Sequence, residues 1–197
     1  KKHKLGMFME MIAHDNPVFS LQESFTGKSL IDKVAHHVLG HTNGGYWSAG
    51  YRQFLGNDES VWEAPGYEVP MVSLSRCESV ELTFPQYHLS SDNYSLMCED
   101  KLEETVETLL KMINILEKNC LLQRKFTGLI ALSNPKYDLY QIPGTDPSML
   151  EEDRFSHRKK WFDLMNGLFR YMDQNMTVLD IAIKYELPFE EVYDYIV

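Results

Sequence analysis

Two short, mostly apolar runs, 5–13 (LGMFMEMIA) and 69–75 (VPMVSLS), limit the possible folds of this chain most strongly. Both are too apolar for a helix with a solvated face, and their length is typical of buried strands. A further short strand is expected at 79–84. Apolar residues recur at helical spacing over 29–39 and 101–118. Strands and amphipathic helices in this order predict an α/β core, in which helices flank part of a mixed sheet.

The second predicted helix has the clearest apolar stripe in the chain. Between the first helix and the second strand, 40–50 (GHTNGGYWSAG) is expected to form a glycine-rich loop. The stripe that the helix over 101–118 is expected to present consists of Leu102, Val106, Leu109, Leu110, Ile113 and Leu116.

The sequence changes character after Asn119. No long periodic run occurs over 121–152, which predicts a linker with a further strand at 126–133. Three short helical patterns follow, and a brief turn joins the last two, TVLDIAIKY and PFEEVYDYI, as in a helix-turn-helix unit. We therefore divide the chain into residues 1–120 and a second part, 121–197, that holds the linker and the helices.

Composition excludes several classes of protein. Lys and Arg number 19 against 29 Asp and Glu, a net charge of −10, which argues against a general nucleic-acid surface. The three cysteines contain no CxxC pair, so neither a thiolate zinc cage nor a disulfide framework is expected, and a reducing, cytoplasmic location fits best. No apolar stretch is long enough to span a bilayer, so no membrane partner is expected. Because the chain begins with Lys1 and stops within a predicted helix, we expect it to be a piece of a longer protein.

Glu10 is the one acid in the first apolar run. Burying a carboxylate in a strand of this kind is costly unless a metal ion or another cation pairs with it. The alternative is that Glu10 faces outward on an edge strand, and periodicity alone does not decide between the two.

Two loops contain the other candidate residues. In 56–70, the acid pair Asp58-Glu59 precedes an aromatic residue and a Pro-Gly turn that leads into the second buried strand. His88 follows a proline turn, with Asp92 four residues on. By spacing alone, a histidine of this kind is more often an ordinary surface or core residue than a metal ligand. A set of three further histidines is better explained as a solvated helix face than as a metal site, namely His36, His37 and His41.

A family resemblance strengthens the metal interpretation. The order of buried strand with an acid, Asp-aromatic loop, proline-led strand, Tyr-His-x-x-x-Asp and amphipathic helix resembles the C-terminal half of the two-zinc aminopeptidase superfamily. That superfamily also contains the glutaminyl cyclases and the catalytically silent transferrin receptor. Bacterial aminopeptidase-like proteins with a winged-helix tail are especially similar, and the resemblance covers essentially the whole chain. Its sharpest points are the segment 9–12, the loop 57–70 and Tyr87-His88 to Asp92.

The resemblance implies a role for each matching residue. Glu10 stands where the family places an acid that binds one zinc ion, and His88 where its last histidine binds the other. Tyr87 is implied as a hydrogen-bond donor to the oxyanion of a tetrahedral intermediate. Asp92 would orient the His88 loop, and Asp58 would have a structural role near the metal cleft.

The chain also departs from the family pattern. The early His-x-Asp, the metal-bridging Asp and the Glu-Glu pair of the family should all precede Glu10, but only nine residues do so here. We therefore expect the C-terminal portion of a zinc-dependent hydrolase, which in its full-length form cleaves an N-terminal peptide bond or a related amide by metal-activated water. The alternatives are a catalytically inactive scaffold and a nucleic-acid-binding module.

The charge of the tail bears on the last alternative. From Glu186 to Val197 the chain has no Lys or Arg, so a helix in this segment would be repelled by phosphates. We therefore expect packing or homo-oligomerisation through the winged-helix-like tail and no nucleic-acid partner. The counter-evidence is a basic cluster formed by Arg154, His157, Arg158, Lys159 and Lys160.

Overall fold

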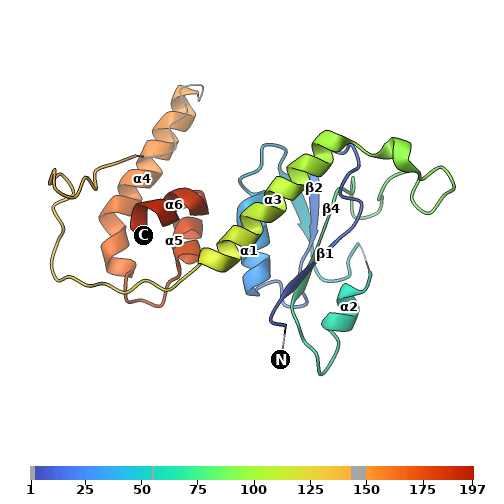
Figure 1. Cartoon of the computed structure of the whole chain (residues 1–197), viewed down its shortest axis with the longest axis horizontal. Helices are drawn as coiled ribbons and strands as arrows, with labels where there is room; N and C mark the ends of the chain where they lie inside the picture. The colour runs from blue at the N-terminus through green and yellow to red at the C-terminus, as the bar shows by residue number, and fades with distance from the viewer. Residues whose placement is uncertain (1–2, 55, 143–149) are drawn as a thin grey trace. The chain divides into compact units, whose positions relative to one another are not determined.

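The computed structural model describes residues 3–54, 56–142 and 150–197 (Figure 1). The chain divides into two compact units, Lys1–Asn114 and Ile115–Val197, so the division in space falls within the long helix α3 (Glu99–Lys118). The domain division at residues 120 and 121 stays a prediction, because a compact unit need not be an independently folding domain.

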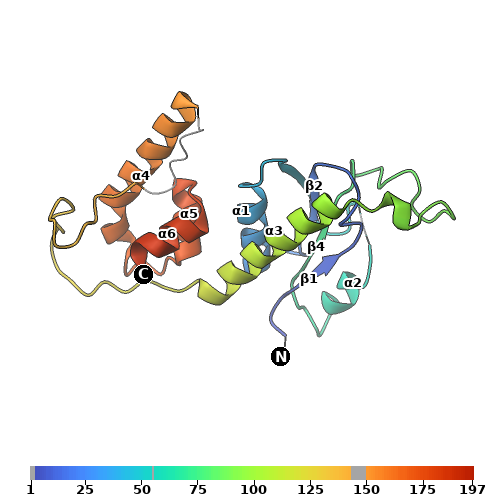
Figure 2. The same ribbon diagram turned by 45° about the horizontal axis from the view of Figure 1, so that its top comes forward.

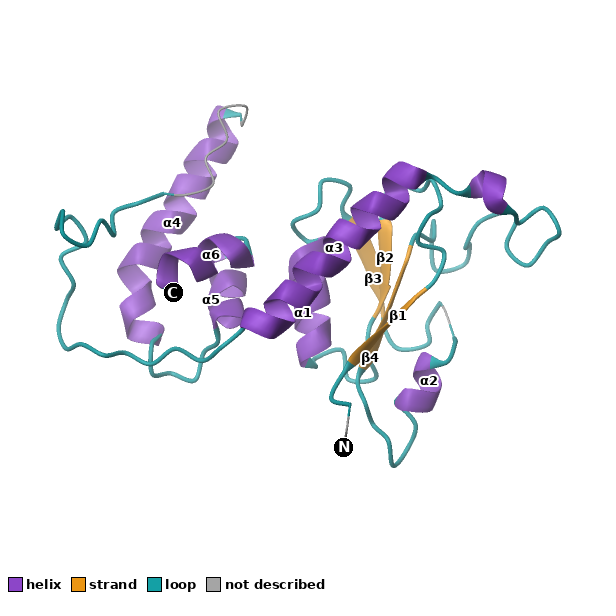
Figure 3. Ribbon diagram, viewed as in Figure 1, coloured by secondary structure: helices purple, strands orange, loops and turns teal. Residues whose placement is uncertain are grey.

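A four-stranded sheet with the strand order β1-β4-β2-β3 forms the centre of the first unit (Figure 3). β1 (Gly6–Met9) is parallel to β4 (Met71–Ser75), and β2 (Phe19–Gln22) is parallel to β3 (Tyr46–Ala49), whereas β2 and β4 are antiparallel. The prediction of a mixed sheet flanked by helices is therefore confirmed. β1 lies at the edge of the sheet and ends at Met9, so Glu10 follows the strand instead of lying in its middle.

Three predictions about strands were wrong. Residues 79–84 and 126–133 form no strand, and β3 occupies part of the segment expected to be a glycine-rich loop. Trp47 of β3 donates from its indole Nε1 to the carbonyl oxygen of Cys77 at 3.1 Å, which ties it to the segment after β4. β2 escaped prediction because it is fully buried and yet alternates apolar residues with polar ones, Ser20 and Gln22.

Helices cover the sheet. In both views α1 (Leu30–Leu39) and α3 lie to one side of it, and α2 (Glu59–Trp62) lies to the other, beside β1 and β4 (Figures 1 and 2). The start of α1 is fixed by Asp32, whose carboxylate accepts from the backbone N–H of Ser29 at 2.8 Å. The apolar face of α1 is buried as predicted, through Ile31, Val34, Ala35, Val38 and Leu39.

The buried face of α3 differs from the predicted stripe. Val106, Leu110 and Ile113 are 46–59% exposed. The buried face includes two threonines, whose hydroxyl groups donate to backbone carbonyls: Thr105 to Ile12 and Lys101, and Thr108 to Glu104. Because these hydroxyls have hydrogen-bond partners, threonine can be buried here. The buried face of α3 is therefore rotated about the helix axis relative to the predicted apolar stripe. The buried residues are Thr105, Thr108, Met112 and Ile115.

The second unit contains α4 (Glu151–Tyr171), α5 (Val178–Tyr185) and α6 (Phe189–Ile196). Its core is formed by Trp161, Leu164, Leu168, Leu179, Phe189 and Val192, all at most 2% exposed. Thr177 caps α5, since its hydroxyl accepts from the backbone N–H of Asp180 at 3.1 Å. Glu186, in the left-handed conformation (φ 52°), turns the chain from α5 into α6.

The predicted linker over 121–152 contains no helix over residues 121–142, and its residues 143–149 lie outside the described part of the chain. Leu121 and Thr177 form an isolated antiparallel bridge. Apart from this bridge, the described residues of the second unit form no β-strand. In the part of the chain that the structure describes, no helix combines the length and the apolar character needed to cross a membrane.

Candidate functional site

Glu10 lies directly after β1, and its backbone N–H donates to the carbonyl of Leu74 in β4 at 3.3 Å. One oxygen of its carboxylate, Oε2, accepts from the side-chain amide Nδ2 of Asn57 at 2.7 Å. The other oxygen, Oε1, is shielded from solvent and has no hydrogen-bond partner among the described residues. A shielded carboxylate oxygen without a donor is costly, so Oε1 marks a position where a cation would be stabilised.

Asn57 lies in the loop before α2 and Glu59 is the first residue of that helix, and the sequence assigned a role to neither. Asp58 is exposed, whereas the next residue, Glu59, is only 1% exposed. Oε1 of Glu59 accepts from the backbone N–H of Asn57 at 2.9 Å and from Nε2 of Gln22 at 3.1 Å. The acid pair was visible in the sequence, but the pattern could not tell which of the two carboxylates faces the interior. The structural role of Asp58 near a metal cleft stays a prediction.

Tyr87 and His88 lie in a turn after Phe84, in which the backbone N–H of Tyr87 donates to the carbonyl of Phe84 at 3.1 Å. The rings of Tyr87 and His88 stack with their centroids 3.9 Å apart. His88 is exposed and has φ 61°, a region that residues other than glycine seldom adopt. Burial raises the pKa of Tyr87, and the negative charge of Glu10 raises it further, so Tyr87 and Glu10 lie within electrostatic range of each other.

A pocket of about 290 Å³ lies beside these residues. Asp92, which the sequence placed next to the His88 turn, is part of its lining together with Tyr87. Met11 and Ile12, the two residues that follow Glu10, also line the pocket. The rest of the lining is mostly apolar and consists of Ala13, His14, Phe84, Asn93, Leu96 and Met97. The pocket can therefore accommodate an apolar group close to Tyr87.

His14 is a lining residue that the sequence analysis did not consider. It borders both this pocket and a second one of about 410 Å³, which also contains Asp15 and Cys98. Its ring lies 4.9 Å from that of Phe84, and its Nδ1 is 3.1 Å from a carboxylate oxygen of Asp15. The sequence signal was the His14-Asp15 pair after the first strand, but nothing in its spacing indicated a pocket.

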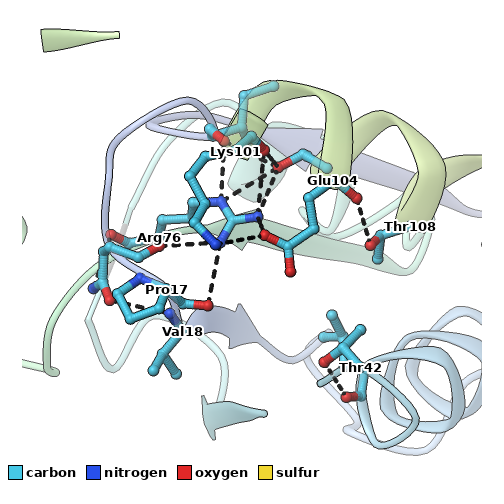
Figure 4. Close-up of polar contacts among 11 residues, drawn as sticks. Pro17, Val18, Thr42, Arg76, Lys101, Glu104 and Thr108 are labelled. Carbon is cyan, nitrogen blue, oxygen red and sulfur yellow. Dashed lines mark hydrogen bonds and ion pairs between the residues drawn. The ribbon is translucent and has the colours of Figure 1, made fainter. Parts of the chain in front are cut away.

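Arg76, directly after β4, fixes the segment that lines the pocket (Figure 4). It is fully buried, and its guanidinium donates to the carbonyls of Ile12 at 3.2 Å and Asn16 at 3.0 Å. The same group pairs with the carboxylate of Glu104 in α3 at 2.9 Å and lies 3.9 Å from the ring centre of Phe19. Burial lowers the pKa of Arg76, while the charge of Glu104 opposes this shift.

The histidines of α1 form a separate cluster. His36 contacts the hydroxyl of Tyr46 at 2.8 Å and the carboxylate of Glu23 at 3.1 Å. His37 is only 8% exposed, which corrects the prediction that these histidines form a solvated face. Burial, followed by the nearby His41, lowers the pKa of His37 to about 4. His41 follows α1, and its Nδ1 lies 2.8 Å from the carbonyl oxygen of His37, whereas Nε2 of His37 is shielded and has no hydrogen-bond partner among the described residues.

The structure thus brings Glu10 and Tyr87 within electrostatic range and places Asp92 at the pocket that Tyr87 lines. In residues 3–54, 56–142 and 150–197, no group of three or more His, Cys, Asp or Glu side chains is arranged to hold a metal ion. The unpartnered oxygen of Glu10 and the exposed imidazole of His88 are nevertheless donor types that zinc accepts. That these two residues are zinc ligands stays a prediction.

The mixed sheet and the helices beside it define an α/β fold. A crystal structure described as that of a "putative peptidase" from Clostridium acetobutylicum matches 98% of the chain with a TM-score of 0.70 and 24% sequence identity. The chain spans 39% of the length of that protein. No curated protein matches the sequence. A domain family of unknown function, DUF4910, matches residues 1–119, and the chain belongs to this family.

Proposed function

We propose that this chain is the C-terminal part of a zinc-dependent, aminopeptidase-like hydrolase that cleaves an N-terminal peptide bond or a related amide. The observation that carries the proposal is the shielded, unpartnered Oε1 of Glu10, in electrostatic range of Tyr87, which lines a mostly apolar pocket. The likeness in fold to the clostridial protein described as a peptidase supports it.

Glu10 and His88 are the proposed zinc ligands of this chain, and the general base and the other ligands would come from outside it. Zinc, when bound, would lower the pKa of a coordinated water and polarise the scissile carbonyl. Tyr87 carries its proton at neutral pH, since the ordinary pKa of tyrosine is about 10 and burial and the charge of Glu10 raise the pKa of Tyr87 further. Its hydroxyl can therefore donate to the oxyanion that develops during attack on an amide. The pocket would hold an apolar side chain of the substrate.

Zinc content tests this assignment. In the full-length protein, we expect Glu10→Gln and His88→Ala each to lower zinc content, measured by elemental analysis, and to abolish amide hydrolysis. His41→Ala is the matched control, because it removes an exposed imidazole that lies against His37 in another cluster. Unchanged zinc stoichiometry in both site variants would refute the assignment. If the two site variants lose zinc but the wild-type protein hydrolyses no amide, the inactive scaffold is favoured instead.

We propose a packing or dimerisation role for the second unit, in which α4 to α6 would be a winged-helix relative. Three residues of the basic cluster of α4, the counter-evidence to this view, lie close to acids. Nζ of Lys159 lies 3.1 Å from Asp163, and Nζ of Lys160 lies 3.0 Å from Glu186. His157 lies 3.7 Å from Glu191 of α6. Cations that are already paired are less able to contact phosphates, which supports a role other than nucleic-acid binding.

A further inference from the structure

The hydrogen bond between Asn57 and Glu10 has a defined direction. A carboxylate oxygen accepts, so the atom of Asn57 that lies 2.7 Å from Oε2 must be the amide Nδ2, because the amide oxygen would repel an ionised Glu10. A bond to a charged acceptor at this distance is stronger than one between neutral groups. Asn57 therefore occupies one of the two oxygens of Glu10 and leaves the shielded Oε1 without a donor.

Asn57 is itself held from two sides. Its backbone N–H donates to the buried carboxylate of Glu59, which also accepts from Gln22 in the interior of the sheet. Its backbone carbonyl accepts from the hydroxyl of Ser60 at 2.7 Å. We call the chain of contacts Gln22–Glu59–Asn57–Glu10 the Asn57 brace. It runs from a residue of β2 that is 1% exposed to the carboxylate at the end of β1.

Glu59 has no partner for its second oxygen among the described residues. A buried carboxylate is a costly way to hold a surface loop, since a serine or a backbone carbonyl could accept the same N–H. The position of the Glu59 carboxylate next to Asn57 is explained if Glu59 keeps the side-chain amide of Asn57 in place to donate to Glu10. Residues behind a ligating carboxylate commonly set its orientation in metal sites.

We infer that Asn57 is a positioning residue, which holds Oε2 of Glu10 so that the carboxylate binds a divalent cation through Oε1 alone. This inference rests on the proposed function, because it takes Glu10 as a ligand. Without the Asn57 amide, the carboxylate is free to rotate and to offer either oxygen or both. The cation would then be held less tightly and with a different coordination geometry.

The test measures the binding of Zn²⁺ and Co²⁺ to the full-length protein. Asn57→Leu removes the amide at nearly constant volume, and Asn57→Ser removes it without added apolar surface, in case the leucine disturbs folding. We expect each variant to bind Zn²⁺ about 10- to 100-fold more weakly than the wild type, by competition with a chromogenic chelator. The visible absorption spectrum of the Co²⁺-loaded protein, which reports coordination geometry, should change as well.

Two further variants separate the possible outcomes. Asn134→Leu is the matched control, since it removes an exposed amide that accepts only in a local turn, from the N–H of Lys136. It should leave affinity and spectrum unchanged. If Glu10→Gln loses Zn²⁺ while both Asn57 variants keep wild-type affinity and spectrum, the positioning role is wrong and the proposed function stands. If Glu10→Gln also keeps Zn²⁺, the proposed metal site itself is wrong.

Discussion

Single residues set the geometry of the candidate site more than the sheet does. Arg76 donates to backbone carbonyls of the segment after β1 and to a carboxylate of α3, and it is fully buried. Asn57 and Glu59 hold the carboxylate of Glu10. Each of these side chains is polar and partly or fully withdrawn from water, so its loss leaves partners without a hydrogen bond.

Replacing Arg76 should be strongly destabilising. Arg76→Leu keeps much of the apolar bulk but removes the buried donor of the Asn16 carbonyl and leaves Glu104 with Lys101 as its remaining partner, so we expect a loss of about 3–5 kcal/mol in the free energy of unfolding. Urea denaturation followed by circular dichroism measures it. Arg124→Leu is the matched control, because Arg124 and its partner Asp173 are each about 40% exposed, and such pairs contribute at most about 1 kcal/mol. Equal losses of stability in the two variants would contradict the stabilising role described for the hydrogen bonds of Arg76.

His37 should make stability depend on pH. Its pKa in the folded protein, about 4, lies below the ordinary value of 6.5, so between these values the unfolded chain binds a proton that the folded protein does not. Stability is therefore expected to fall as the pH is lowered from 6.5 towards 4, by about 3 kcal/mol at most. His37→Leu should flatten this dependence in urea titrations at several pH values. His41→Leu should retain most of it, and a slope unchanged by His37→Leu would argue against a buried neutral imidazole.

At the scale of elements, sequence patterns identified those whose apolar residues follow one period. The helices α1, α3, α5 and α6 and the strands β1 and β4 were predicted close to their positions. The short strands β2 and β3 were not, since four residues give too little periodicity and Ser20 and Gln22 are buried by hydrogen bonds to other segments. The face of α3 was misjudged for the same reason: buried threonines bind carbonyls that no sequence pattern reveals.

The same limit applies to the candidate site. Glu10, Tyr87, His88, Asp92 and Asp58 could be named from the order of motifs. Asn57 and Glu59 could not, because their importance comes from partners 47 and 37 residues away along the chain. A contact between residues this far apart follows from the packing of α2 beside the sheet, and a single sequence does not encode it in any local pattern.

The packing of α4 against α5 depends on one glycine. A Cβ at Gly167 would lie 2.1 Å from the hydroxyl of Tyr185. Gly→Ala inside a helix normally stabilises by up to about 1 kcal/mol, but here we expect a loss of about 1–3 kcal/mol from overcrowding. In a Tyr185→Phe background, which lacks the hydroxyl, the alanine should cost less, because its remaining contacts, with Cε2 of Tyr171 and Cζ of residue 185, are 3.3 Å long. Thermal unfolding of the four proteins measures this, and no coupling between the two substitutions would show that the contact is unimportant.

At the scale of the whole molecule, family membership and fold establish what the chain is similar to, and its charges limit what it binds. The chain spans 39% of the length of the clostridial protein it matches. Fold and function are separate inferences, and only the first follows from a structural match.

The charge distribution predicts weak contact with nucleic acid. The net charge is −10, the first turn of α6 is acidic, and Lys159 and Lys160 of α4 are paired with acids. We expect no gel shift of duplex DNA at physiological ionic strength. A salt-dependent complex under these conditions would overturn this view, and weakening of that complex by Lys159→Ala together with Lys160→Ala would locate it on α4.

The burial of Arg76 has one more consequence. Because a single guanidinium serves both the segment after β1 and the first turns of α3, neither can open without exposing the polar groups of the other. Local opening in this part of the molecule should thus be concerted. The amide protons of the two segments would exchange with solvent deuterium at matched rates, although about 90 residues separate them in the chain.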